Sequence, residues 1–140
     1  MRTISFASFT IDESFEVELK ELINLAMCGK YMESLNILYK CKLTRVSPVL
    51  ICRQFINKFK LLEKIFILKE QGLTIDKIVQ KPELKIFYQE KQFIFSQIKI
   101  WNFEKIYKSI NKLLETEIKC KIMHEMDYSF IENAILFIKE

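Results

Sequence analysis

Hydrophobic residues recur along this chain every three or four positions, with polar residues between them. This spacing places the hydrophobic side chains on one side of a helix. The first clear example is the stripe formed by Phe15, Leu19, Leu22, Ile23 and Ala26. The same kind of pattern predicts helices at about residues 12–28, 31–42, 47–71, 75–80, 83–100 and 102–123, and a last one from residue 127 or 129. We therefore expect an all-α fold, a single compact bundle of about seven helices.

Residues typical of helix ends flank these stretches. Ser47 can cap a helix and Pro48 suits its first position, so the helix at 47–71 has the clearest start. Gly29 and Gly72 are suited to ending the helices before them. Other cap candidates are Thr74, Asn102, and two pairs with capping-box spacing, Thr10 with Glu13 and Ser129 with Glu132.

Two of the predicted helices stand out. The helix at 47–71 has a wide apolar arc, which predicts a central position, and a polar line that includes Arg53, Lys60 and Lys64. The helix at 102–123 is strongly periodic, with apolar residues at Phe103, Ile106, Tyr107, Ile110, Leu113, Leu114 and Ile118. Residues 1–11 show no clear period, so we divide the chain into an arm over 1–11 and one helical domain over 12–140.

The helix at 83–100 carries more aromatic residues than one face can hold. Ile86, Phe93 and Ile100 form one line, and a second line is formed by Phe87, Ile94 and Trp101. One helix of a small bundle seldom buries both lines, so the surplus suggests a partner surface. A core that is simply rich in phenylalanine is the alternative, and the sequence leaves both open.

Composition excludes several classes of protein. The chain has 140 residues, half of them apolar, with two glycines and two prolines. So few turn residues disfavour all-β folds and glycine-rich phosphate loops. The net charge of +4 comes from lysines scattered along the chain, whereas a dedicated duplex-DNA binder usually has a denser basic patch.

No constellation of residues predicts catalysis, a metal site or a cofactor. His124 is the only histidine and has no recognisable nucleophile paired with it. Cys28, Cys41, Cys52 and Cys120 lack zinc-ligand spacing and are interpreted as small buried residues in a reducing compartment. The amino terminus does not resemble a signal peptide, and no window is apolar enough to span a bilayer, so we expect a cytoplasmic protein that is not itself an enzyme.

One motif favours an alternative function. The segment Gly72–Val79 and the helix after it could form a helix-turn-helix, which would make the chain a small DNA-binding regulator. A recognition helix should expose polar and basic residues, but this one carries Phe87, Tyr88, Phe93, Phe95 and Trp101. A helical hairpin within a bundle is the simpler interpretation.

Several segments resemble one family. The strongest is Ile86-Phe87-Tyr88 followed by Lys91, Ile94, Gln97, Ile98 and Trp101; the others are Leu113-Leu114-Glu115-Thr116-Glu117-Ile118 with Lys121, Arg53-Gln54-Phe55, and Met27 to Lys30 with Leu35, Ile37 and Leu38. Their order and spacing are similar to the C-terminal collar domain of the delta subunit of the bacterial DNA polymerase III clamp loader, in its alphaproteobacterial version. The likeness covers about residues 12–140. The family's ATPase-like and lid domains have no counterpart here, so residues 1–11 are interpreted as a possible lid remnant and the chain as a split gene, a degraded paralogue or a trimmed version.

The resemblance implies a role in assembly. Collar domains of five clamp-loader subunits pack in a ring, so the implied partners are the delta-prime and gamma/tau subunits, with DNA involved only indirectly and no membrane. The clamp-opening element lies in the part without a counterpart, so we do not expect this chain to open the clamp, and an isolated collar could associate with itself. No cofactor or metal is implied. The residues proposed for the partner interface are Arg53, Lys60, Lys64, Phe87, Tyr88 and Trp101.

Overall fold

A computed structural model describes residues 17–139 of the chain. These residues form a helical segment at 17–27, α2 (Tyr31–Leu43), α3 (Pro48–Glu70), α4 (Ile75–Val79), α5 (Tyr88–Ile100), α6 (Phe103–Ile122) and α7 (Asp127–Lys139), with short 3-10 turns at Pro82–Leu84 and His124–Met126. The described part therefore has seven α-helical segments and no strand, which confirms the predicted all-α fold. The proposed arm over residues 1–11 and the pair Thr10 and Glu13 lie outside the described residues.

The predicted helix ends are mostly confirmed. The side chains of Ser47, Thr74 and Asn102 each accept a hydrogen bond from the backbone N–H three residues further on, at 3.4, 3.4 and 2.9 Å. These bonds satisfy N–H groups that have no partner within the helix. Gly29 and Gly72 adopt φ angles of +87° and +97°, which a residue with a Cβ adopts only with strain.

One helix begins later than the sequence predicts, and another begins at one of its two predicted starts. The helix expected from residue 83 begins at Tyr88, because Lys85 is left-handed at φ +53° and Phe87 is extended. Neither conformation continues a helix. The last helix begins at Asp127, one of the two starts considered, so Ser129 lies inside α7 and does not cap it.

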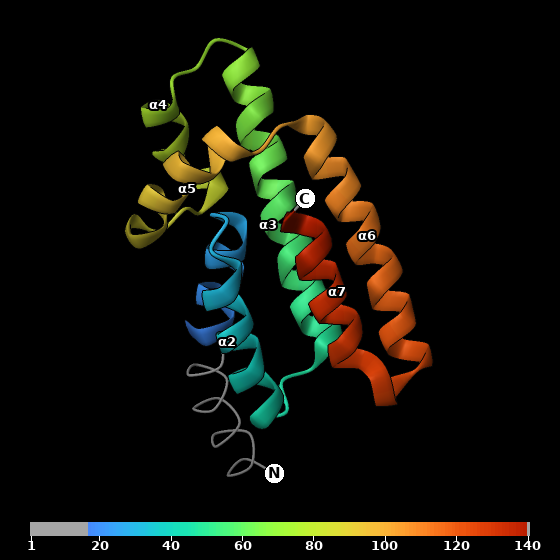
Figure 1. Ribbon diagram of the computed structural model, residues 1–140. Helices are drawn as coiled ribbons and strands as arrows, with labels where there is room; N and C mark the ends of the chain where they lie inside the picture. The colour runs from blue at the N-terminus through green and yellow to red at the C-terminus, as the bar shows by residue number, and fades with distance from the viewer. Residues whose placement is uncertain (1–16, 140) are drawn as a thin grey trace, which may run out of the picture.

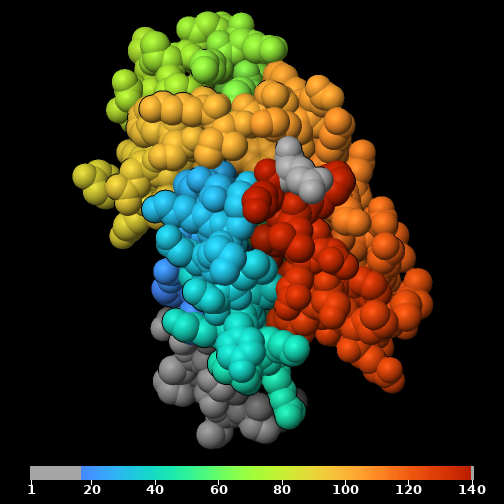
Figure 2. Space-filling view, in the orientation of Figure 1, coloured from blue at the N-terminus to red at the C-terminus, as the bar shows by residue number. Residues whose placement is uncertain are grey.

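The long helix α3 lies at the centre of the molecule, as predicted. It contacts α4, α5, α6 and α7, and Figure 1 shows α5 and α6 on opposite sides of it, with α7 in front. Phe55, Phe59 and Ile65 of α3 are fully buried. In the space-filling view of Figure 2, α2 and α7 lie side by side along the front of the molecule, and these two helices are in contact. Within residues 17–139, no helix is both long and apolar enough to span a bilayer.

Candidate subunit interface

The helix α6 has hydrophobic residues on two of its sides. Ile106 and Leu113 are buried, together with Ser109, Thr116, Glu117 and Cys120. A second row remains exposed and consists of Tyr107, Leu114, Ile118 and Ile122, which are 50, 41, 58 and 73% exposed. We call these four residues the α6 stripe. Their spacing of seven, four and four residues keeps them on one side of the helix.

One end of the α6 stripe lies against α3. A hydrogen bond between Tyr107 and Glu63 of α3 raises the pKa of the tyrosine hydroxyl. The Tyr107 ring also stacks on Phe103 with 6.3 Å between centroids, and Phe103 meets Phe66 of α3 at 5.8 Å. Aromatic contacts of this length are favourable, so they fix the position of Tyr107 at the edge of α3.

The other end is tied to α3 by an ion pair. Glu117 accepts a hydrogen bond from Arg53 Nη2 at 3.2 Å, and its second oxygen lies 2.9 Å from Arg53 Nε. Lys121 Nζ lies 3.1 Å from the same carboxylate. The Glu117 side chain is only 6% exposed, whereas that of Arg53 is 51% exposed. Because a two-point contact fixes the plane of the guanidinium, Arg53 is held beside the stripe while half of it stays accessible.

A row of positive charges borders the stripe on the α3 side. Arg53, Lys60 and Lys64 recur at intervals of seven and four residues, and all three are exposed. Together with the α6 stripe they form what we call the α3/α6 face. α7 lies on another side of α6, where Lys112 and Lys119 sit over the rings of two α7 phenylalanines, 5.6 and 5.8 Å from the ring centroids.

Trp101 belongs to the core and not to an exposed surface. It is 5% exposed, and its ring meets Phe59 edge to face at 4.8 Å. Its Nε1 donates a hydrogen bond of 2.8 Å to the carbonyl oxygen of Met27. This corrects the expectation that Trp101 is a partner anchor. Its ring is buried within the chain, and its single N–H has a hydrogen-bond acceptor there.

Phe87 and Tyr88 are exposed, as a partner surface requires, but they do not belong to the α3/α6 face. They are 59 and 84% exposed at the start of α5. Lys58 of α3, whose Nζ lies 3.6 Å from Glu90 of α5, marks the side of α3 that faces α5. Since α5 and α6 flank α3 on opposite sides (Figure 1), the six proposed residues form no single surface. Three lie on the α3/α6 face, two at the start of α5 and one in the core.

Phe87 stands beside a separate groove. A cavity of about 510 Å³ is lined by Val17, Phe87 and Phe93 together with polar residues of the helical segment 17–27 and of α5. Lys20 Nζ lies 4.8 Å from the centroid of the Phe87 ring. This cation–π contact partly covers Phe87, which leaves Tyr88 as the more open of the two aromatic residues.

The pKa values of the four cysteine thiols are those expected of buried, unreactive side chains. Burial raises the pKa of Cys52 to about 12 and also raises the pKa values of Cys28, Cys41 and Cys120. A nucleophilic thiol needs a lowered pKa, so none of the four is activated. Among residues 17–139 the structure contains no group of three His, Cys, Asp or Glu residues placed to hold a metal ion. The side chain of His124 is exposed, in a turn after α6.

The geometry gives no support to a recognition helix. α4 has five residues, and a 3-10 turn separates it from α5. α5 carries two lysines, and one of them, Lys91, has its Nζ 5.9 Å from the centroid of the Tyr88 ring. α5 exposes the polar residues Gln89, Gln92, Ser96 and Lys99, but it also exposes the apolar residues Tyr88, Phe95 and Ile100. A helix that reads a groove of DNA usually has a denser set of basic residues on its exposed side.

The exposed half of α6 is what reasoning from the sequence missed. The regular spacing predicts one apolar side, but the apolar residues span two sides, with Ile106 and Leu113 on one and Leu114 and Ile118 on the other. The available signal was the polar set at Ser109, Thr116 and Glu117. These residues continue the line of Ile106 and Leu113, and they show that the helix uses part of its buried side for hydrogen bonds.

Comparisons with known proteins agree with this fold. The family described as DNA polymerase III delta subunit, C-terminal domain, matches residues 18–138. Among solved structures, the Bacillus subtilis DNA clamp loader delta protein (YqeN) superimposes with a TM-score of 0.69 at 23% identity, over 88% of this chain and 36% of that protein. The chain thus spans little more than a third of that structure, and at this identity the likeness shows the fold. No curated protein matches the chain in sequence.

The match to the family extends over nearly the whole of the described structure, from the helical segment 17–27 to α7. The chain belongs to the family of the C-terminal domain of the DNA polymerase III delta subunit.

Proposed function

We propose that this chain is a non-catalytic collar module of the replication clamp loader, and that its α3/α6 face packs against the corresponding domain of a neighbouring subunit. Family membership supports the clamp-loader role. One observation carries the choice of face, namely the exposed α6 stripe bordered by Arg53, Lys60 and Lys64. An apolar centre with a charged rim is the composition of many protein interfaces.

The size of the α6 stripe suits a specific contact. It runs from Tyr107 to Ile122, a span of fifteen residues or roughly 22 Å along a helix. A standard interface buries on the order of 800 Å² on each partner, so a stripe of this length can supply its centre and the cations of α3 can lie at its rim. Those cations are suited to carboxylates on the partner, and they would determine orientation more than affinity.

The remaining parts of the proposal concern context. The neighbours are the delta-prime and gamma/tau types of subunit. The chain contacts DNA only through the assembly, and the assembly is cytoplasmic. Residues 12–140 form the collar domain, and residues 1–11 are an arm or the remnant of a lid. Without its partners, the exposed α6 stripe could drive self-association, because an uncovered apolar surface favours any complementary contact.

Co-purification with the other clamp-loader subunits, with the complex sized by light scattering, tests the proposal. The decisive variant is Ile118→Asp, which places a charge in the centre of the α6 stripe. It should weaken assembly by at least ~30-fold, since truncating a true anchor typically costs ~2 kcal/mol or more. The matched control is Leu43→Asp on α2, because Leu43 is 66% exposed and Ile118 is 58% exposed.

The outcome separates three cases. Loss of assembly with Ile118→Asp but not with Leu43→Asp supports the α3/α6 face. Assembly that is unchanged by both variants means that another surface makes the contact. If the wild-type chain stays alone although it is well folded, the assembly role itself is wrong. Salt dependence then tests the DNA-binding alternative, because binding to phosphates weakens steeply with salt whereas a largely apolar contact does not.

A further inference from the structure

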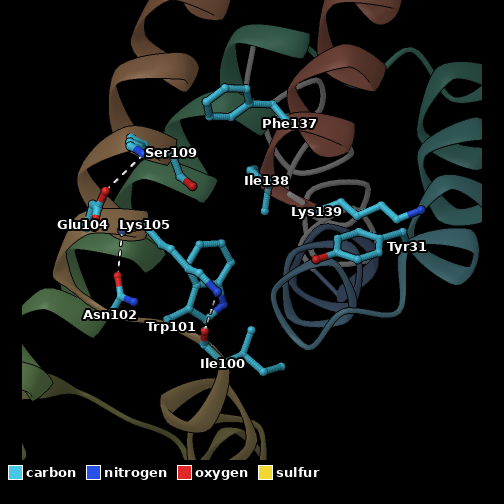
Figure 3. A pocket seen from close by; sticks show the side chains of 11 residues that line it. Tyr31, Ile100, Trp101, Asn102, Glu104, Lys105, Ser109, Phe137, Ile138 and Lys139 are labelled. Carbon is cyan, nitrogen blue, oxygen red and sulfur yellow. Dashed lines mark hydrogen bonds and ion pairs between the residues drawn. The ribbon is translucent and has the colours of Figure 1, made fainter.

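A cleft lies where α2, α6 and α7 meet, away from the α3/α6 face. It has a volume of about 340 Å³. Figure 3 shows Lys105 and Ser109 of α6 on one side and Tyr31 and Lys139 on the other, with Trp101 between them. Ligand pockets in proteins usually measure ~300–1,000 Å³, so this cleft has room for one small molecule.

The walls combine aromatic rings with hydroxyl groups. Trp101 lines the cleft with only 5% of its surface exposed, and its hydrogen bond to Met27 fixes the position of the ring. Tyr31 is partly buried, and burial raises the pKa of its hydroxyl, so the group is a neutral donor and acceptor at pH 7. Ser109, which is 3% exposed, adds a second hydroxyl to the lining. The accessible rings of the lining are those of Phe137, which is 39% exposed, and of Tyr31. Such rings offer flat surfaces on which a planar group can stack.

Positive charge outweighs negative charge around the cleft. Within residues 17–139, its lining contains three lysines, Lys105, Lys108 and Lys139, and one carboxylate, Glu104. Lys105 Nζ donates to the carbonyl oxygen of Ile100 at 3.4 Å, and an ammonium group has two further protons to donate. Lys108 and Glu104 are 3.2 Å apart, but both are well exposed, so this pair is weak and open to exchange.

The start of α6 adds to the field. Asn102, which caps this helix, also lines the cleft. α6 has twenty residues, and its amino-terminal end carries a partial positive charge that favours anions. Lysines, hydroxyl donors and a helix start therefore converge next to aromatic rings.

We propose that this cleft binds a nucleotide, with the phosphate near Lys105 and Lys108 at the start of α6 and the base against the aromatic wall. Its volume suits one nucleotide. The nucleotide can be free or part of a single strand, since both present the same phosphate and base. This proposal does not depend on the assembly role, because the cleft and the α3/α6 face share no residue.

Trp101 provides a direct measurement, because it is the only tryptophan and lines the cleft. Its fluorescence should change in a saturable way as thymidine monophosphate is added to the whole chain. The double variant Lys105→Gln with Lys108→Gln should weaken this binding by at least ~10-fold, since charge-assisted hydrogen bonds carry much of the affinity for a phosphate. The control, Lys40→Gln with Lys42→Gln, removes two exposed lysines near the other end of α2 and should change binding less than ~2-fold.

Three ligands identify what is bound. Inorganic phosphate should bind more weakly than thymidine monophosphate; equal binding would overturn the role of the aromatic wall. A short oligothymidylate that binds better than the mononucleotide would identify the source as a single strand, and equal or weaker binding would identify a free nucleotide. The proposal fails if no ligand gives a saturable change up to ~10 mM, well above a millimolar Kd. It also fails if the control variant loses as much affinity as the lysine variant.

Discussion

α5 and α6 both pack against α3, but they use their hydrophobic residues in opposite ways. α5 buries only Ile94 and Gln97, and the buried Trp101 follows it, while Tyr88 at its start is almost fully exposed. α6 buries one complete side over twenty residues and exposes a second apolar row on another side. The helix that is rich in aromatic residues is therefore attached at a few points, whereas the aliphatic one is attached along its length and still offers a surface.

Polar contacts explain why α5 is attached at a few points and α6 along its length. On the α5 side, Gln97 donates to Asn24 at 3.3 Å, and Trp101 donates to the backbone of Met27. These bonds require one exact placement of α5, because a buried donor without an acceptor costs free energy. On the α6 side, the contact between Arg53 and Glu117 lies at the edge of a long apolar seam. Buried polar residues thus indicate which side of a helix is anchored, where hydrophobic spacing alone does not.

The largest expected effect is at the anchor of α5. Trp101→Ala should lower the free energy of unfolding by ~3–5 kcal/mol, because it leaves a cavity beside Phe59 and an unpaired carbonyl at Met27. Tyr88→Ala, at a site 84% exposed, should change it by less than ~0.5 kcal/mol. Urea unfolding of both variants measures the difference. Similar losses from the two would show that α5 is anchored at its start.

The two sides of α6 provide the next test. Ile106→Ala should destabilise the fold by ~2–5 kcal/mol, because Ile106 is fully buried. Ile118→Ala should cost less than ~0.5 kcal/mol, because Ile118 is 58% exposed. Both changes remove the same atoms from the same helix, so thermal or urea unfolding compares their environments alone. A large loss from Ile118→Ala would mean that the α6 stripe is covered within the chain.

The ion pair on the α6 side should matter less. Glu117→Ala should cost ~1–3 kcal/mol, since it removes the hydrogen bond from Arg53 and the ion pair with Lys121, while both cations can still turn toward water. The control is Glu115→Ala. Glu115 lies two residues before Glu117, on the exposed side of α6, and its carboxylate is 2.9 Å from Lys119. An exposed pair of this kind contributes little to stability because water screens it. If both substitutions have equal effects in urea unfolding, burial of Glu117 adds nothing.

The sequence predicts the elements well because their signals are local. Ser47, Thr74 and Asn102 act on the backbone three residues away, so a cap can be recognised without knowing the fold. The left-handed Lys85 that delays α5 has no such signal, since lysine does not favour that conformation. The predicted interface depends on which neighbour covers each helix. Spacing along one helix is enough to predict that Arg53, Lys60 and Lys64 share an exposed side. The burial of Trp101 depends on Met27 and Phe59, which are far away in sequence.

The smallest expected effect comes from the lysine between α3 and α5. The Lys58 side chain is only 10% exposed, its Nζ has no hydrogen bond among the described residues, and Glu90 lies 3.6 Å away. Lys58→Met keeps the length of the side chain and removes the buried charge. At pH 7 it should leave stability unchanged or raise it by up to about 1 kcal/mol, because an imperfectly paired buried ion costs more to desolvate than it recovers. Lys60→Met, at an exposed site, is the matched control.

The pH dependence of this effect distinguishes the buried charge from simple packing. Burial lowers the pKa of Lys58 from its ordinary value of 10.5, and the attraction of Glu90 offsets only part of this shift. Between the lowered pKa and 10.5, the unfolded chain binds more protons than the folded chain, so this lysine makes stability rise with pH. Below that window the cost of the buried charge is fully present. The stability advantage of Lys58→Met over the wild type should therefore shrink as the pH rises toward 10.5, whereas the Lys60→Met difference should stay flat. An advantage for Lys58→Met that does not change with pH would show that the methionine improves packing and that the amine was never penalised.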